Sequence, residues 1–258
     1  MLFKTSTVNQ YEFIKEGKGQ PLVLFHGLMG GLSNFDSLIS FFSKNGFTVF
    51  APKLPIFGFE VKDTKVETIA KFAINFLKDI VKKPASILGN SLGGHIGLIV
   101  SHNQPKLVKS LILTGSSGLF ERSFGESFPK RGNYYYVKKK TQDVFYDPKI
   151  ATNEIIDEVY ETVNNRDKAI KTLYIARSAM KHNMKKEVGK IELPVCLIWG
   201  KQDNVTPPEV ALEFNKLLKN SELYWIDKCG HAPMMEHPDE FNESLSTWFR
   251  KVGVTKAK

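Results

Sequence analysis

The chain has 258 residues, 42% of them hydrophobic and 24% charged, and its 36 basic residues outnumber its 27 acidic ones to give a net charge of +9. This composition excludes fibrous, collagen-like and disordered proteins, and the length suffices for one α/β domain with a sizeable core. The sequence does not open with a charged leader and an apolar run, and no window holds the roughly 18 apolar residues of a membrane helix. The two cysteines build no disulfide framework. We therefore expect a soluble, cytoplasmic protein.

The first half of the sequence alternates short apolar runs with longer amphipathic segments. Short apolar runs bounded by turn residues predict buried strands, and apolar positions at helical spacing predict helices. Because the strands are apolar throughout and alternate with helices, they predict a parallel sheet covered on both faces. In chain order we expect strands over 11–15, 21–25, 47–51, 85–88 and 108–114, and helices over 34–43, 66–80 and 92–102.

The alternation breaks after residue 114. Residues from about 117 to 190 are polar, have helical spacing and contain no strand of the same type. We therefore expect one domain, residues 1–258, with a helical cap inserted at approximately 117–190. Strands resume over 194–199 and 223–226, each followed by a helix, over 208–218 and 239–252.

The one dense run of positive charge in the sequence lies in this cap. Tyr134-Tyr-Tyr-Val-Lys-Lys-Lys140 places three lysines after an aromatic stretch. Aromatic rings can stack on bases while lysines hold phosphates. The other lysines are scattered along the chain and no nucleic-acid motif accompanies the run, so a solvated lysine-rich face explains it more simply. We therefore expect a small-molecule substrate as partner, and no nucleic acid or membrane.

A Gly-x-Ser-x-Gly pentapeptide, Gly89-Asn-Ser-Leu-Gly93, lies between an expected strand and an expected helix. This setting is typical of a nucleophile elbow, in which a sharp turn holds the serine in a strained backbone conformation. The two glycines remove Cβ atoms that would collide with the neighbouring strand and helix. The helix dipole also favours negative charge on the serine oxygen. A plain tight turn would share the pentapeptide, but the setting predicts Ser91 as the nucleophile.

A serine nucleophile needs a base, and the base needs a carboxylate that orients it. His231 and Asp203 each follow one of the last two expected strands. The carboxyl ends of parallel strands face one crevice, so both residues can meet Ser91 there, in the chain order Ser, Asp, His. An acid could instead follow the strand over 108–114, but no carboxylate stands at positions 115 to 117. Asp227 is too near a strand end to turn under the imidazole, so we predict Asp203 as the acid.

The loop after the strand over 21–25 has the sequence His26-Gly27-Leu28-Met29-Gly30-Gly31. Its glycines let a backbone N–H point into the crevice, so we assign one oxyanion donor to Leu28 and the other to Leu92, the residue after the nucleophile. We expect His26 to hold this loop through hydrogen bonds. The spacing is not Gly-x-Gly-x-x-Gly, which excludes a dinucleotide-binding turn. No histidines or cysteines have the spacing of a metal site, so we expect no metal and no cofactor.

Together, the His-Gly loop, the elbow, the Trp-Gly-x-x-Asp turn and the Gly-His loop resemble the α/β-hydrolase superfamily over nearly the whole chain. The resemblance implies the α/β-hydrolase fold, a mostly parallel eight-stranded sheet with helices on both faces and a helical cap insertion. The extended elbow Gly89–Gly94 and Gly115-Ser-Ser-Gly118 are similar to the meta-cleavage-product C–C hydrolases. Lys53-Leu-Pro-Ile-Phe-Gly58 departs from the family's Asp-x-Pro-Gly-x-Gly, which affects the pocket wall. Ser91 argues against haloalkane dehalogenases and epoxide hydrolases, which use an aspartate nucleophile.

These residues predict a serine hydrolase that cleaves a small to medium carboxylic ester through an acyl-enzyme. Two alternatives stay open. The resemblance implies a C–C hydrolase in which a cap arginine holds an acidic dienoic substrate. We prefer Arg166 to Arg177 for this role, because Arg166 lies at an expected helix start near the crevice. Solvated helix residues remain the simpler interpretation of both arginines. The other alternative is a ligand-binding protein with slow turnover on the same fold. Apolar residues that flank the motifs are expected to line the substrate pocket: Met29, Phe57, Leu119, Val205 and Pro233.

Overall fold

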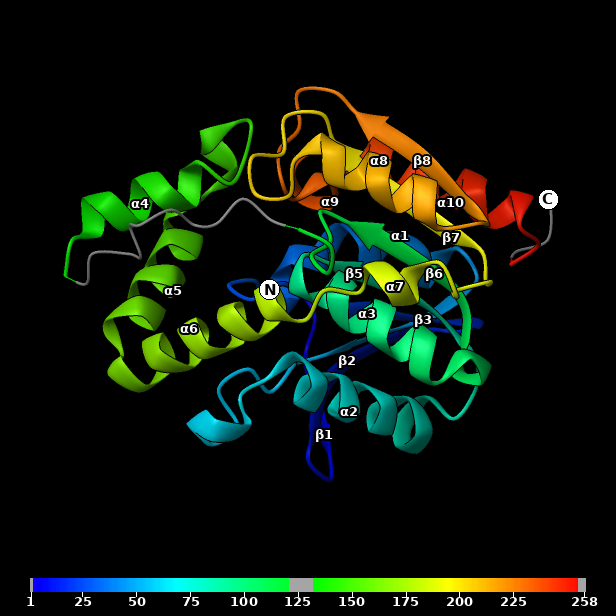
Figure 1. Ribbon diagram of the computed structural model, residues 1–258, viewed down its shortest axis with the longest axis horizontal. Helices are drawn as coiled ribbons and strands as arrows, with labels where there is room; N and C mark the ends of the chain where they lie inside the picture. Colours follow the sequence, from blue (N-terminus) through cyan, green and yellow to red (C-terminus); the bar gives the residue numbers. More distant parts are fainter. Residues whose placement is uncertain (1, 121–131, 255–258) are drawn as a thin grey trace.

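The computed structural model describes residues 2–120 and 132–254, in which eight strands form one sheet with helices on both faces (Figure 1). The strands are β1 (Ser6–Val8), β2 (Tyr11–Gly17), β3 (Gln20–Phe25), β4 (Phe47–Pro52), β5 (Ala85–Asn90), β6 (Val108–Thr114), β7 (Val195–Gly200) and β8 (Ser221–Ile226). Their order across the sheet is β1-β2-β4-β3-β5-β6-β7-β8. Neighbours from β4 to β8 are parallel, whereas the β1–β2 and β2–β4 pairs are antiparallel. This confirms the predicted mostly parallel, eight-stranded sheet.

The central strands are buried along their length because helices cover both faces. Every residue of β5 and β7 is buried, and in β3 the exposed residue is Gln20, at its start. By contrast, β1 is three residues long, is fully exposed and pairs with β2 at the edge of the sheet. A strand this short with no apolar face has no pattern from which the sequence could predict it.

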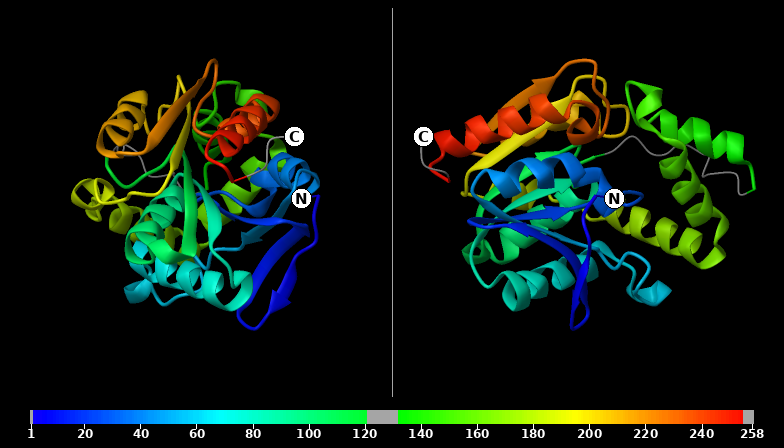
Figure 2. Two further views of the ribbon diagram at one scale, coloured as in Figure 1. Left: turned by 90° about the vertical axis from the view of Figure 1, so that its right-hand side faces the viewer. Right: turned by 180° about the vertical axis from the view of Figure 1, so that it is seen from behind.

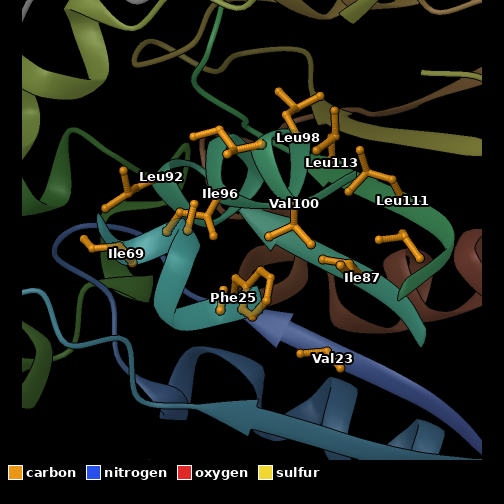
Figure 3. Packing of buried hydrophobic residues seen from close by; sticks show 14 of the residues in the cluster. Val23, Phe25, Ile69, Ile87, Leu92, Ile96, Leu98, Val100, Leu111 and Leu113 are labelled. Atoms are coloured by element: carbon orange, nitrogen blue, oxygen red, sulfur yellow. The ribbon is translucent and has the colours of Figure 1, made fainter. Parts of the chain in front are cut away.

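Two layers of helices enclose the sheet (Figure 2). On one face lie α1 (Asp36–Lys44), α9 (Pro233–Glu236) and α10 (Pro238–Lys251), and on the other lie α2 (Val66–Phe76), α3 (Leu92–Asn103) and α8 (Pro208–Leu217). Figure 3 shows Leu92, Ile96 and Val100 of α3 among apolar side chains of the sheet and of α2. In the described residues, five short helical segments lie between these elements: η1 (Leu32–Phe35), η2 (Val61–Asp63), the π-helical η3 (Leu77–Val81), η4 (Pro105–Leu107) and, in the chain between β6 and β7, η5 (Pro148–Ile150).

The chain between β6 and β7 forms the helices α4 (Tyr134–Gln142), α5 (Asn153–Asn164), α6 (Arg166–Lys181) and α7 (Lys185–Val188). In Figures 1 and 2, α4, α5 and α6 project away from the sheet, and we call residues 134–181 the helical arm. Side-chain oxygens of Asn133, Thr152 and Asn165 accept the first-turn N–H groups of α4, α5 and α6, which explains where these helices begin. Residues 121–131 of the expected cap lie outside the described residues.

Among the described residues, none of the helices combines the length and the apolar character that crossing a bilayer requires.

Candidate active site

Ser91 lies at the sharp turn between β5 and α3, with φ of 56° and ψ of −120°. A positive φ is unfavourable for a residue with a side chain, so the surroundings must hold it. The Ser91 N–H donates to Thr114 O at 3.1 Å. A Cβ atom on Gly89 would lie 2.3 Å from Gly93 O, and one on Gly93 would lie 1.9 Å from Phe25 O. The turn therefore requires glycine at both positions.

Asp203 lies in the loop after β7, and its side chain is completely buried. Its Oδ1 accepts the N–H groups of Val205 and Thr206 at 2.8 and 3.0 Å. Its Oδ2 accepts the Thr206 hydroxyl and lies 2.9 Å from His231 Nδ1. A carboxylate can be buried when its oxygens are fully hydrogen-bonded, and here each oxygen has two donors.

The contact between Asp203 and His231 assigns the ring's tautomer. Because Asp203 is an acceptor, Nδ1 carries the proton and Nε2 is left to act as a base. Asp227 makes no comparable contact with the ring in the described residues. Its exposed carboxylate lies 3.4 Å from Gln202 Nε2 and 3.6 Å from Lys201 Nζ, and these two groups lower its pKa.

Asn90 joins the loop of Ser91 to the loop of His231. The buried Asn90 amide donates from Nδ2 to Thr114 O and to His231 O, both at 3.1 Å. On the other side of the loop, a Cβ on Gly115 would lie 2.8 Å from His231 Nδ1. The residue before the nucleophile therefore fixes the backbone of the base. Asn90 is absent from the residues predicted for the site, although a polar residue at the end of a buried strand was a usable signal.

The His26–Gly31 loop reaches the nucleophile. A Cβ on Gly27 would lie 3.3 Å from Ser91 Cβ, and the Gly30 N–H closes a turn around Leu28 by donating to Gly27 O at 3.2 Å. His26 Nδ1 lies 2.9 Å from Gly27 O, and His26 Nε2 accepts the Leu54 N–H at 3.0 Å. Burial lowers the pKa of His26, so the ring is neutral and holds the loop. Leu92 begins α3, where a first-turn N–H has no intrahelical acceptor.

The predicted pocket residues fall into two groups. Leu119 is buried and Phe57 is half-buried, and both pack with Leu28 against the apolar cluster that contains Leu92. Val205 and Pro233 lie beside the acid and the base, Val205 half-buried and Pro233 buried. Met29 is 37% exposed. Leu28, Phe57 and Leu119 come from the loops after β3, β4 and β6, and their lining of a substrate pocket stays a prediction.

Arg166 begins α6, and Lys168 Nζ in the same first turn lies 5.7 Å from the centre of the Phe57 ring. Asn165 caps α6 as expected, but Arg166 is exposed, and the start of α6 lies at the outer end of the helical arm in both views (Figures 1 and 2). Capping residues predict where α6 begins but do not tell which end of a helix faces the sheet, so a role of Arg166 in the pocket stays a prediction. Arg177 is exposed too. Lys171 instead donates to Phe57 O at 3.1 Å, with its side chain 12% exposed.

The buried His95 on α3 contacts the end of the arm. Its Nε2 lies 3.0 Å from Nδ1 of His182, which follows α6. Burial, with a smaller contribution from the charge of His182, lowers the pKa of His95 from its ordinary value of 6.5 to about 3. Nothing in the spacing of the two histidines along the sequence relates them. In the described parts of the chain, no cluster of His, Cys, Asp or Glu side chains is suited to hold a metal ion.

A family model described as alpha/beta hydrolase fold matches residues 20–145 and 151–238. The chain is 31% identical to a 2-hydroxy-6-oxo-6-(2'-aminophenyl)hexa-2,4-dienoic acid hydrolase of Metapseudomonas resinovorans, over 95% of this chain and 89% of that protein. It is 30% identical to 2-hydroxy-6-oxononadienedioate/2-hydroxy-6-oxononatrienedioate hydrolase 1 of Pseudomonas putida, over 91% and 89%. A solved alpha/beta hydrolase enzyme from the metagenome of lagoon sediments of Mar Chica, Morocco, is 44% identical with a TM-score of 0.80, over 96% and 98%.

Proposed function

The chain belongs to the alpha/beta hydrolase family, and on that premise we propose that it is a serine hydrolase with Ser91 as nucleophile, His231 as base and Asp203 as the acid that orients the base. The contact of 2.9 Å between His231 Nδ1 and Asp203 Oδ2 carries this proposal. A buried carboxylate that holds an imidazole next to a strained serine turn is the arrangement that a serine nucleophile needs.

In the proposed reaction, Ser91 Oγ attacks the substrate carbonyl while His231 Nε2 accepts the hydroxyl proton. The oxygen of the tetrahedral intermediate becomes negative and accepts hydrogen bonds from the Leu28 and Leu92 N–H groups. His231 then gives its proton to the leaving alcohol. Water attacks the acyl-enzyme with His231 again as base, and the carboxylic acid leaves. Throughout, Asp203 keeps the proton on Nδ1 and leaves Nε2 available for proton transfer.

The proposed substrate is a small to medium carboxylic ester. Its support is the apolar character of the predicted pocket residues and of Leu28 beside them, since Leu28, Phe57 and Leu119 offer surface to an acyl chain and no charge. We take the chain as one domain in which the helical arm and α7 form a cap over this pocket. Residues of this cap would then limit the length of acyl chain that the enzyme accepts.

Two measurements on the purified protein test this proposal. Hydrolysis rates across aryl esters of increasing acyl length should show turnover, with a fall in kcat/KM once the chain exceeds the pocket. A fluorophosphonate probe should label the protein covalently. Binding of esters with neither turnover nor labelling would instead support the ligand-binding alternative on this fold.

A second candidate is hydrolysis of a C–C bond in an acidic dienoate. Two relatives that are 31% and 30% identical are named as hydrolases of such compounds, and this observation favours it. The exposed Arg166 and Arg177 do not suit recognition of the acid, whereas Lys171 contacts a predicted pocket residue, Phe57. Assay of a 2-hydroxy-6-oxo-dienoate beside the aryl esters decides between the two, since the natural bond class should give the higher kcat/KM.

A further inference from the structure

Glu236, on α9, accepts hydrogen bonds from two distant parts of the backbone. Its Oε1 accepts the Gly230 N–H at 2.8 Å, and its Oε2 accepts the Tyr146 N–H at 2.7 Å. Gly230 directly precedes the proposed base, whereas Tyr146 belongs to the segment that follows α4 in the arm. One carboxylate therefore joins the loop of His231 to the segment that follows α4 in the helical arm.

The two joined segments are also in direct backbone contact. The His231 N–H donates to Val144 O at 3.0 Å. A Cβ on Gly230 would lie 2.6 Å from Val144 O and 2.9 Å from Tyr146 N, so no larger residue fits between them. Because His231 bonds to Val144 O, the position of the His231 backbone depends on the position of residues 144–146. Glu236 holds both partners of that contact.

We propose that Glu236 is a positioning residue for the general base, and that it fixes His231 by tying the Gly230–His231 loop to residues 144–146. This inference rests on the proposed function, in which His231 transfers the proton. A carboxylate suits the task because both of its oxygens accept hydrogen bonds, and charge-assisted bonds are short and strong. A glutamine has one such oxygen, so its amide N–H₂ would face one of the two N–H donors.

Glu236 differs in this respect from Glu240, an exposed residue that lies four positions later, on α10. Substitution of either residue by glutamine removes one negative charge from the same region. Among the described contacts, the Glu236 carboxylate bonds to the base loop, and Glu240 has no bond to that loop. The Glu240→Gln variant is therefore the matched control for the loss of charge alone.

The test is steady-state kinetics of Glu236→Gln on an aryl ester that the unmodified protein hydrolyses, with the rate of fluorophosphonate labelling measured in parallel. A misplaced base slows the chemical step without weakening substrate binding, so kcat and the labelling rate should fall about tenfold while KM changes less than about twofold. Glu240→Gln should retain the original values. Glu236→Asp, which keeps two acceptor oxygens on a shorter side chain, should recover part of kcat, a result that loss of folding would not give.

An unchanged kcat in Glu236→Gln, or a rise in KM without a fall in kcat, would overturn the inference and leave the proposed function intact. An equal loss in the Glu240→Gln control would overturn it too, because charge rather than position would then be the cause. If the unmodified protein neither hydrolyses esters nor reacts with the probe, the proposed function fails first, and the role of Glu236 fails with it.

Discussion

The sheet edge that carries Ser91, Asp203 and His231 differs from the helical arm in how firmly its side chains are held. At the sheet edge, Asp203 is completely buried with donors on both oxygens, and Ser91 lies in a turn where neighbouring glycines have no room for a Cβ. In the arm, buried side chains such as Val137 and Ile175 hold the helices together, while Tyr135 is 77% exposed and Arg166 is exposed. We propose that the buried sheet edge carries the chemistry and that the arm selects the substrate.

Several contacts join the two regions, among them the hydrogen bonds of Lys171 with Phe57 O and of Tyr146 N–H with Glu236. His231 N–H bonds to Val144 O, His95 contacts His182, and the Val66 N–H donates to Ser178 Oγ at 3.1 Å. Substitutions in the core should therefore reduce catalysis or stability strongly, while substitutions on the outer arm should change little apart from substrate choice.

The largest effect is expected from Ser91→Ala. Removal of the nucleophile should lower kcat by about 10⁴-fold or more, because the oxyanion donors and substrate binding alone give little turnover. The circular dichroism spectrum and thermal midpoint should stay close to those of the unmodified protein. A variant that kept more than about a tenth of the activity would show that another residue attacks the substrate.

Asp203→Asn is expected to be nearly as damaging. An amide in place of the carboxylate favours the wrong tautomer of His231, so kcat should fall on the order of 10³- to 10⁴-fold. Asp227→Asn is the matched control, since Asp227 pairs with Gln202 and Lys201 at the surface, and it should retain activity within about twofold. A larger loss for Asp227→Asn than for Asp203→Asn would make Asp227 the orienting acid.

Gly93→Ala in the core and Tyr135→Ala in the arm test how much each region contributes to the free energy of unfolding. A methyl group at position 93 meets Phe25 O at 1.9 Å, so either the elbow or β3 must shift, and the free energy of unfolding should fall by about 3 kcal/mol. Tyr135→Ala, on the exposed face of α4, should change it by less than about 0.5 kcal/mol. Urea titrations of the two variants make this comparison, and equal losses would contradict the difference between the regions.

A pH dependence of stability should follow from His95, where core and arm meet. Its folded pKa of about 3 is below its ordinary value of 6.5, so on acidification the unfolded chain takes up the proton first. The contribution of His95 to the free energy of unfolding should therefore be level above about pH 6.5 and fall toward pH 3, by at most about 1.4 kcal/mol for each pH unit. Denaturation of His95→Gln at pH 7 and pH 5 should show a shallower slope, and an identical slope would contradict the assignment.

The smallest effect is expected from Arg166→Leu. Because this arginine is exposed at the outer end of the arm, kcat/KM for neutral esters and for acidic dienoates should change by less than about twofold. A selective loss for the acidic substrate, measured on both substrates in one assay series, would restore Arg166 to a role in recognition.

The features that follow from local sequence could be predicted. The buried strands, the elbow around Ser91 and the loops of Asp203 and His231 each depend on a few consecutive residues, and the parallel sheet brings the strand ends together. Other features depend on how separate loops pack. The roles of Asn90 and Glu236 need the His231 loop, Thr114 and Tyr146 in place, and no spacing in the sequence relates them.

The direction of the arm helices could not be predicted from the sequence either. Its capping residues predict where helices begin, but the direction of α6 decides that Arg166 lies outward and that Lys171 reaches Phe57. That direction is set by packing between helices with few buried residues, in α5 by Ile156 and Val163. Substrate class is therefore harder to predict than reaction class.

The most direct test of the central claim is covalent labelling with a fluorophosphonate probe, followed by mass spectrometry of the peptides. The account predicts one modified residue, Ser91, with labelling lost in Ser91→Ala and slowed in Asp203→Asn. It also predicts that labelling slows as the pH is lowered through the range in which an imidazole takes up a proton. A probe adduct on another residue, or labelling that persists in Ser91→Ala, would contradict the assignment of the nucleophile.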